Sequence, residues 1–337
     1  GWISPGFESN DLGLTFGTDV INKHVSVGYR WLERGQYIRS ASASVAFANN
    51  HDFDGVNTSD VIFSMASMRF LNFWSLNLSG GYSFENVANT ALRGGPRVIE
   101  EPEAFFNAGL NSDYRKNISG FASLDLNSTA DGSSETGVSM SLNMKLGDRT
   151  NLSIGPSIYK STDMTQHITS IDAPENTSMY GKRYVVARLD QTVTAAEIRV
   201  DYPITPRFTL EGYFQPFFAV GDYSKFKEYK HPESNDFLIY GEEGSTIDEN
   251  FMVDPTGGSD EDAFELYNPN FNYKALIGTM VLRWEFSPGS TLFLVWTHNG
   301  TNFDNPGNFD LSRDLESLLK SEADDVFALK LSYWFGQ

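Results

Sequence analysis

Apolar and polar residues alternate along most of this chain. In a β-strand successive side chains point to opposite faces, so alternation predicts a strand whose two faces differ. The clearest case is the stretch 326–335. Its apolar side chains Phe327, Leu329, Leu331, Tyr333 and Phe335 alternate with Ala328, Lys330, Ser332 and Trp334. This pattern predicts a final strand with one apolar face and one mixed face.

The same pattern predicts about 15 strands, and 14–16 once uncertain boundaries are allowed for. Each is roughly ten residues long, which suits a strand that crosses a membrane at a tilt. The predicted strands are 25–31, 37–49, 58–71, 73–85, 104–113, 117–128, 135–147, 152–158, 164–172, 179–189, 192–203, 206–219, 273–286, 290–299 and 326–335. The predicted fold is all-β: a transmembrane antiparallel β-barrel that occupies residues 1–337 as a single domain.

Short and long connections alternate between these strands. The short turns are 34–36, 71–73, 114–117, 147–150, 203–206 and 287–290, and the longest loops are 85–103, 220–272 and 299–325. Outer-membrane barrels have short periplasmic turns and long external loops. We therefore expect these loops to be external and the C-terminus to be periplasmic. The segment 160–192 does not fit the alternation.

Composition permits a barrel without requiring one. No run of about 20 apolar residues, the length of a transmembrane helix, occurs in the chain. Aromatic residues make up 14% of it, although its mean hydropathy is only −0.33. Such residues would suit the aromatic girdles of a membrane barrel. The alternative is a soluble protein in which each apolar face is buried against a second sheet.

An odd number of strands would place Gly1 at the external side, whereas bacterial single-chain barrels have even strand numbers. Either residues 12–19 form another strand, or the chain is the C-terminal part of a larger barrel. No signal peptide opens the sequence. A free sheet edge cannot face lipid, because its backbone groups would be unsatisfied. A partial barrel would therefore need a second chain or an upstream segment to complete it.

Charge and residue usage exclude several classes of function. A net charge of −19 argues against a nucleic-acid partner, which would require a basic surface. With no cysteine, thiolate metal sites and cysteine nucleophiles are excluded. The five histidines show no zinc-type spacing, and no hydrolase motif occurs. We expect no enzyme activity and no cofactor, and regard Asp260 and Asp262 as weak candidates for a cation site.

Charged residues on the mixed strand faces are candidates to line a lumen. Barrel interiors are polar, and charges inside a membrane line a path or pair with one another. The alternative is a set of buried ion pairs that hold the wall or a plug in place. The candidates are Arg30, Lys145, Glu197, Arg199, Asp201, Arg283, Glu285 and Lys330.

One helix is predicted, over 312–320. Leu311, Leu315, Leu318 and Leu319 keep helical spacing, and Ser312 or Asp310 could cap its N-terminus. We expect the helix to pack on the barrel mouth. The alternative is a helix that binds the membrane or a partner.

Several motifs resemble one family over almost the whole chain. They are Ser4-Pro5-Gly6-Phe7-Glu8, Asn10-Asp11-Leu12-Gly13, Arg93-Gly94-Gly95-Pro96, 184–192 (YVVARLDQT), Gln215-Pro216-Phe217, Gly221-Asp222-Tyr223-Ser224, 282–286 (LRWEF) and 288–296 (PGSTLFLVW). Together they resemble the C-terminal region of a family of bacterial outer-membrane proteins, "domain of unknown function 5916". Its members often carry an N-terminal domain similar to carbohydrate-binding module family 9. The resemblance implies further barrel sequence upstream, and it supplies no catalytic residues.

Two functions follow as expectations. The first is a channel or transport barrel of the bacterial outer membrane that moves a solute, with a saccharide link suggested only by the resemblance. The second is a structural barrel that anchors surface domains or belongs to a larger assembly. In both cases the expected partners are the bilayer and its lipopolysaccharide.

Overall fold

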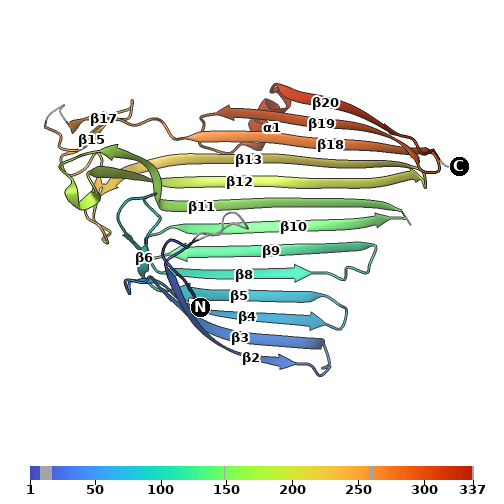
Figure 1. The fold of residues 1–337 in the computed structure, drawn as a ribbon, viewed down its shortest axis with the longest axis horizontal. Helices are drawn as coiled ribbons and strands as arrows, with labels where there is room; N and C mark the ends of the chain where they lie inside the picture. The colour runs from blue at the N-terminus through green and yellow to red at the C-terminus, as the bar shows by residue number, and fades with distance from the viewer. Residues whose placement is uncertain (8–16, 148, 259–261, 336–337) are drawn as a thin grey trace.

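A computed structural model describes residues 1–7, 17–147, 149–258 and 262–335 of the chain. Most of them form one antiparallel sheet in which strands that follow one another in sequence lie side by side (Figure 1). The strands along the main path of this sheet are, in order, β1 (Trp2–Ile3), β2 (Val20–Trp31), β3 (Ile38–His51), β4 (Asn57–Phe70), β5 (Ser75–Ser83), β8 (Glu103–Asn111), β9 (Ile118–Thr129), β10 (Ser134–Leu146), β11 (Thr150–Asp172), β12 (Lys182–Thr205), β13 (Phe208–Tyr229), β18 (Phe271–Ser287), β19 (Ser290–Asp304) and β20 (Ala323–Ser332). The short strand β14 (Phe237–Ile239) pairs with the end of β13 beside this path.

The all-β prediction is confirmed, with corrections to the strand boundaries. The predicted strands 152–158 and 164–172 are one strand, β11, and 179–189 and 192–203 are one strand, β12. Bulges in the β11–β12 pairing let β11 continue through its polar middle. The last strand ends at Ser332, not at Phe335. Most of the optional strand 12–19 lies outside the described residues.

Connections of different length lie at opposite ends of the sheet. At one end, here called the turn end, β12 and β13 are joined by two residues and β18 and β19 by two more. At the other, the loop end, lie the connections 84–102, 173–181, 230–270 and 305–322. The merged strands β11 and β12 remove the exception at 160–192. Strand β13 runs to Tyr229 and β19 to Asp304, so the predicted loops 220–272 and 299–325 begin later than expected.

The two faces of the sheet differ in polarity. One hydrogen-bonded row crosses the polar face from β2 to β19 through Arg30, Ser42, Ser67, Asn77, Gly109, Ser123, Ser139, Ser157, Ala195, Phe217, Ala275 and Thr301. The opposite, apolar face carries Trp74, Leu142 and Leu331, which are 40%, 41% and 64% exposed. No second sheet of comparable size occurs in the described part of the chain, and side chains of this face are exposed.

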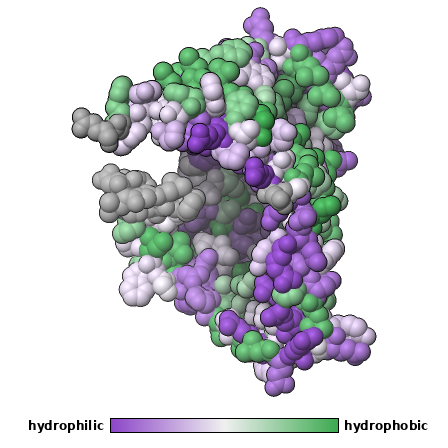
Figure 2. Space-filling view, turned by 90° about the vertical axis from the view of Figure 1, so that its right-hand side faces the viewer, coloured by the Kyte–Doolittle hydropathy of each residue, from purple (hydrophilic) through white to green (hydrophobic). Residues whose placement is uncertain are grey.

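The row is also staggered relative to the ends of the strands. It begins at Arg30, one residue from the turn end of β2, and reaches β19 at Thr301, three residues from that strand's loop end. Tilted strands of a curved sheet require such a stagger. Seen from the turn end, the molecule curves around a hollow that is open on one side (Figure 2).

The sheet is open within the described residues. Strand β1 pairs only with Val20 and Ile21, and Gly1 exchanges two backbone hydrogen bonds with Asn22, which leaves the rest of the outer edge of β2 without a partner. At the opposite edge, all residues of β20 are exposed. Both β2 and β20 run toward the turn end, because an even number of antiparallel steps separates them. Among the described residues the sheet does not close into a barrel.

At the loop end, β11, β12 and β13 extend beyond their neighbours and are covered on both sides. On one side, Val186 and Tyr184 of β12 pack with Leu92 and Val98, near the short strands β6 (Asn86–Ala88) and β7 (Val98–Glu100). On the other, Val185 and Ala187 pack with the segment of β14 (Phe237–Ile239), β15 (Thr246–Ile247), β16 (Met252–Asp254) and β17 (Phe264–Glu265). This end therefore has a compact core of its own.

The predicted helix is α1 (Leu311–Lys320), and Asp310 is its N-cap, with a side chain that accepts a hydrogen bond from the Arg313 backbone N–H. Its expected position at the mouth is wrong. The helix lies on the apolar side of the sheet, because its polar side chains bond to Asn272 and Asn302 there. No helix in the described residues is long and apolar enough to cross a membrane.

Candidate functional site

The eight predicted lumen-lining residues all lie on the polar face, at positions that alternate with apolar ones on their strands. Three of them, Lys145, Arg199 and Asp201, line one hollow of about 270 Å³. Arg30 lines another, of about 370 Å³, together with Arg69. The structure therefore gathers half of the predicted residues into two polar hollows on the wall.

These residues do not form a buried ion-pair ladder. Among the eight, the one ion pair recorded in the described structure is Arg199–Glu197, at 3.7 Å, and both side chains are more than half exposed. Arg199 also lies over the ring of Tyr213, and Lys330 over that of Phe293. Glu285 accepts a hydrogen bond from the Gly289 backbone N–H at the β18–β19 turn. Exposed pairs of this kind contribute little to stability.

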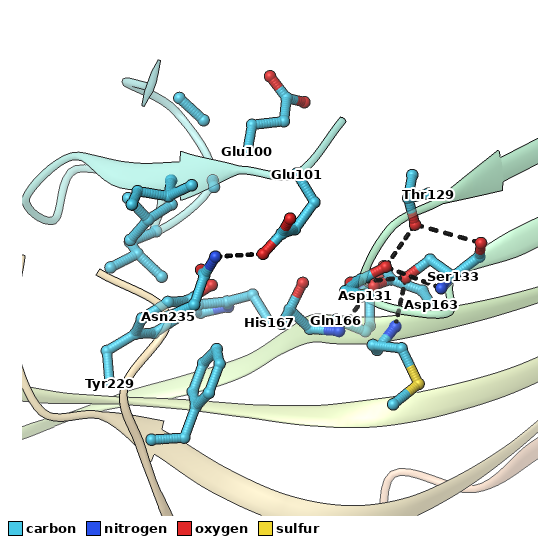
Figure 3. Close-up of a pocket in the computed structure, with 18 of the residues that line it drawn as sticks. Glu100, Glu101, Thr129, Asp131, Ser133, Asp163, Gln166, His167, Tyr229 and Asn235 are labelled. Carbon is cyan, nitrogen blue, oxygen red and sulfur yellow. Dashed lines mark hydrogen bonds between the residues drawn. The ribbon is translucent and has the colours of Figure 1, made fainter. Parts of the chain in front are cut away.

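A larger pocket of about 670 Å³ lies at the loop end of the polar face (Figure 3), and we call it the mouth pocket. Its volume lies in the range of small-molecule sites. Five segments of the chain form it: the 88–103 loop, the β9–β10 turn, the middle of β11, the end of β13, and 235–237. Glu103 and Thr129, paired across β8 and β9, mark where the polar face ends and the pocket begins.

Two interruptions of the β11–β12 register shape the floor of the mouth pocket. They lie between Asp163 and Gln166 and between His167 and Thr169. A bulge redirects side chains and bends the strand. Here it brings Asp163, Gln166 and His167 together in the pocket lining. The bulge is supported by hydrogen bonds, from Thr165 N–H to Asp163 Oδ1 at 2.8 Å and from Met164 N–H to Ser133 Oγ at 2.9 Å.

One wall of the mouth pocket carries two neighbouring carboxylates, Asp131 and Asp163 (Figure 3). Asp131 accepts hydrogen bonds from the backbone N–H of Ser133 at 2.8 Å, from the hydroxyl of Ser133 at 3.0 Å and from the hydroxyl of Thr129. Burial, and to a lesser extent the charge of Asp131, raise the pKa of Asp163, although the Thr165 N–H opposes this. This wall therefore offers many hydrogen-bond acceptors, and ionising both of its carboxyl groups is unfavourable in free energy.

Glu100, Glu101 and Glu103 also line the mouth pocket. Glu101 accepts a hydrogen bond from the side-chain amide of Asn235 (Figure 3). Burial raises the pKa of Glu100, and the charge of Glu103 adds to this. The lining thus contains five carboxyl groups against two cationic side chains, Arg93 and Lys227.

Lys227 lies against an aromatic ring, and His167 adds little positive charge to the pocket. The Lys227 ammonium lies 4.0 Å from the centre of the Phe237 ring, and burial lowers the pKa of Lys227. Burial and the charge of Arg93 lower the pKa of His167, so its imidazole is neutral at pH 7. Its Nε2 lies 3.2 Å from the Ser170 hydroxyl, and its buried Nδ1 has no hydrogen-bond partner. The pocket therefore offers mainly acceptors, to a ligand with several hydrogen-bond donors.

The loop over the mouth pocket is anchored at two points. Arg97 forms a 2.6 Å ion pair with Asp52, whose carboxylate is fully buried and also accepts from the Val56 backbone N–H. At Gly95, an added Cβ would lie 2.6 Å from the Tyr184 ring, so only glycine allows this close approach. The Arg93–Pro96 motif therefore lies in the loop predicted at 85–103 and holds that loop against β12.

The sequence pattern identified none of the pocket lining as a site. The residues come from loops and from the bulged part of β11, where alternation fails. The weak cation candidates gain no support: Asp260 lies outside the described residues, and Asp262 is exposed. Among the described residues no group of three His, Asp or Glu side chains is arranged to hold a metal ion.

Comparison with known proteins gives one match. A family model described as "Domain of unknown function (DUF5916)" matches residues 2–336. No curated protein and no solved structure matches the chain.

Proposed function

We propose a function for this chain, which belongs to the family described as domain of unknown function 5916. The chain forms a membrane-spanning part of the wall of a β-barrel in the bacterial outer membrane. The barrel gives solutes a polar path across that membrane. The C-terminus and the turn end are periplasmic, and the loop end with the mouth pocket faces the exterior. The surrounding partners are lipid and lipopolysaccharide.

The observation that carries this proposal is the uncovered apolar face. Aromatic and aliphatic side chains such as Tyr29, Leu142, Trp284 and Leu331 remain exposed there across the whole sheet. Soluble monomers seldom expose apolar patches beyond a few hundred Å². On β18 the apolar positions run from Leu276 to Trp284, eight residue steps or about 26 Å along the strand. That length suits the apolar band of an outer-membrane barrel, about 25 Å tall.

The two open edges support a further part of the proposal, that additional strands complete the barrel. Unpaired edges are not tolerated in lipid. Since β2 and β20 run in the same direction, they cannot pair antiparallel with each other. An odd number of added strands is needed, whether they come from an upstream segment or from a second chain. A second copy of this sheet in the same membrane orientation also presents parallel edges, so it does not fill the gap.

Transport is favoured over a purely structural role by the polar face. The exposed Arg199, Glu197 and Lys145 lie on the hollow side, where a plug would bury them. The compact loop-end core around Val185 and Val186 favours the second candidate, a barrel that presents a surface domain. The saccharide link and the absence of enzyme activity remain predictions from sequence.

The test is ion conductance of the complete barrel, meaning the full polypeptide or complex that contains this chain, in planar bilayers. We expect discrete conductance steps and selectivity that changes when Arg199 and Lys145 are replaced by Gln, because these charges line the path. Control substitutions at Ser128 and Ser134, on the apolar-side register, should leave selectivity unchanged. A correctly inserted protein that passes no current would support the structural role instead.

A further inference from the structure

Helix α1 crosses several strands on the apolar side of the sheet. Its approach places Phe309 against Phe218 of β13, Asp314 bonds to Asn272 of β18, and Ser317 bonds to Asn302 of β19. After the helix, Ser321 and Ala323 lie beside Gly300, where β20 begins. The helix therefore runs across the strands, from β13 toward β20, and does not follow any one of them.

The helix is held to the sheet by polar contacts. Asp314 is fully buried and accepts hydrogen bonds from Asn272 Nδ2 at 3.0 Å and from Arg313 Nε at 2.8 Å. Lys274, also fully buried, donates to Asp304 at 2.9 Å and to Asn302 at 3.0 Å, and its Nζ lies 4.0 Å from Asp314. A helix at a sheet usually buries its apolar side. Here the sheet-facing side is charged.

The leucines of α1 lie on a different flank. Leu311, Leu315 and Leu319 are 59%, 39% and 66% exposed, whereas Leu318 is buried. At 100° per residue, the three exposed leucines point about a quarter of a turn around the helix axis from Asp314 and Leu318. They form a continuous stripe beside the sheet, while Glu316 and Lys320, which bond to each other, lie on the far flank.

Chirality fixes the direction of this stripe. Asn22 points to the polar face and bonds to Gly1, so in a chain of L-residues β1 lies to the right of β2 when the apolar side is viewed with the loop end up. Strand order then runs leftward, and so does α1. In a right-handed helix with Asp314 against the sheet, the leucine stripe faces the turn end, toward the apolar band.

The helix lies at the border of that band. Its contacts on β18 are Asn272 and Lys274, and the apolar positions of the same face begin at Leu276, two residues further along. Below it the band continues through Phe214 and Trp296, whose rings lie 6.2 Å apart. The stripe is therefore continuous with the surface assigned above to lipid.

We propose that α1 is an interfacial helix whose Leu311, Leu315 and Leu319 insert among the acyl chains at the outer border of the bilayer. The inference rests on the proposed membrane location. Interfacial helices place one apolar flank among acyl chains and a charged flank in water. The same helix shields Lys274 and Asp314 from lipid, where unpaired charges would be costly.

The experiment uses depth-dependent quenching in the complete barrel reconstituted into phosphatidylcholine vesicles. The chain has no cysteine, so single variants can be labelled with bimane at one position. The variants are Leu315→Cys and Leu319→Cys in the stripe, Glu316→Cys on the opposite flank, and Leu142→Cys on the apolar face of β10. The quenchers are lipids brominated near the headgroup or deep in the acyl chain.

We expect the labels at 315 and 319 to be quenched at least twofold more than that at 316, and more by shallow than by deep bromines. The label at 142 should be quenched by both. Quenching at 142 with none above the level of 316 in the stripe would overturn the interfacial helix alone. No quenching at 142 either would overturn the membrane location itself.

Discussion

A paired substitution on β10 tests which face of the sheet meets lipid. Leu142 and Ser141 are adjacent, but Leu142 points to the apolar face and Ser141 to the polar face. The apolar positions of β10 run from Val138 to Leu146, so Leu142 lies at their centre. The variants Leu142→Arg and Ser141→Arg therefore introduce the same side chain on opposite sides of one strand.

The expected costs differ widely. An arginine on the lipid face at the bilayer midplane costs about 2–4 kcal/mol. That is roughly a 30- to 700-fold change in the unfolding equilibrium constant. An arginine at 141 points into the hollow. Glu197 lies on the same face of the sheet, where it pairs with Gly155 of β11. Its cost should stay within about 0.5 kcal/mol, as for an ordinary surface substitution.

The measurement is reversible guanidinium unfolding of the complete barrel in lipid vesicles, followed by tryptophan fluorescence. The difference between the two variants is the informative quantity, because both carry the same added charge and side-chain entropy. Equal costs, or a cost below about 1 kcal/mol for Leu142→Arg, would refute the assignment of this face to lipid.

Two further predictions concern the loop end. Asp52→Ala removes the buried partner of Arg97 and the acceptor of the Val56 N–H, at a cost of about 1–3 kcal/mol given that Arg97 is partly exposed. Limited proteolysis should then cut the 84–102 loop faster, and unchanged cleavage would contradict an anchoring role. Burial raises the pKa of Asp163 in the folded state, so the folded protein binds this proton more tightly than the unfolded chain does. The free energy of unfolding therefore rises as the pH falls through the folded-state pKa toward 3.8. Asp163→Asn should therefore raise the denaturant midpoint at pH 7 and have less effect at pH 3; equal effects at both would argue against a buried charge.

Alternation predicted the strands because the two faces of each strand meet different environments. On β5 and β10 one side chain in two meets the hollow and the other meets the apolar side, so period 2 is visible. The cap of α1 was also predictable. Asp310 directly precedes the periodic leucines, and an acidic side chain there accepts an N-terminal N–H.

The mouth pocket could not be predicted in this way. Beyond residue 163, β11 has compact protein on both sides instead of a hollow and an apolar surface, so the alternation is lost and one strand reads as two. The pocket depends on the register shift at 163–169 and on contacts such as Arg97–Asp52, 45 residues apart. Neither leaves a local signal in the sequence.

The same reasoning explains the position of the helix. Asn272 and Lys274 point to the apolar side of β18, as Asn302 and Asp304 do on β19. From the sequence of each strand alone, these residues indicate only where its apolar face ends. In the structure these polar side chains lie against α1. Their hydrogen-bonding partners there are Asp314 and Ser317. A helix with a charged residue on the side next to its leucines is a poor fit for a soluble core. It fits a site where the sheet supplies the polar partner and the leucines have a different apolar medium to enter. The polar residues on the strands and the leucines on the helix therefore mark one level, the loop-end border of the apolar band.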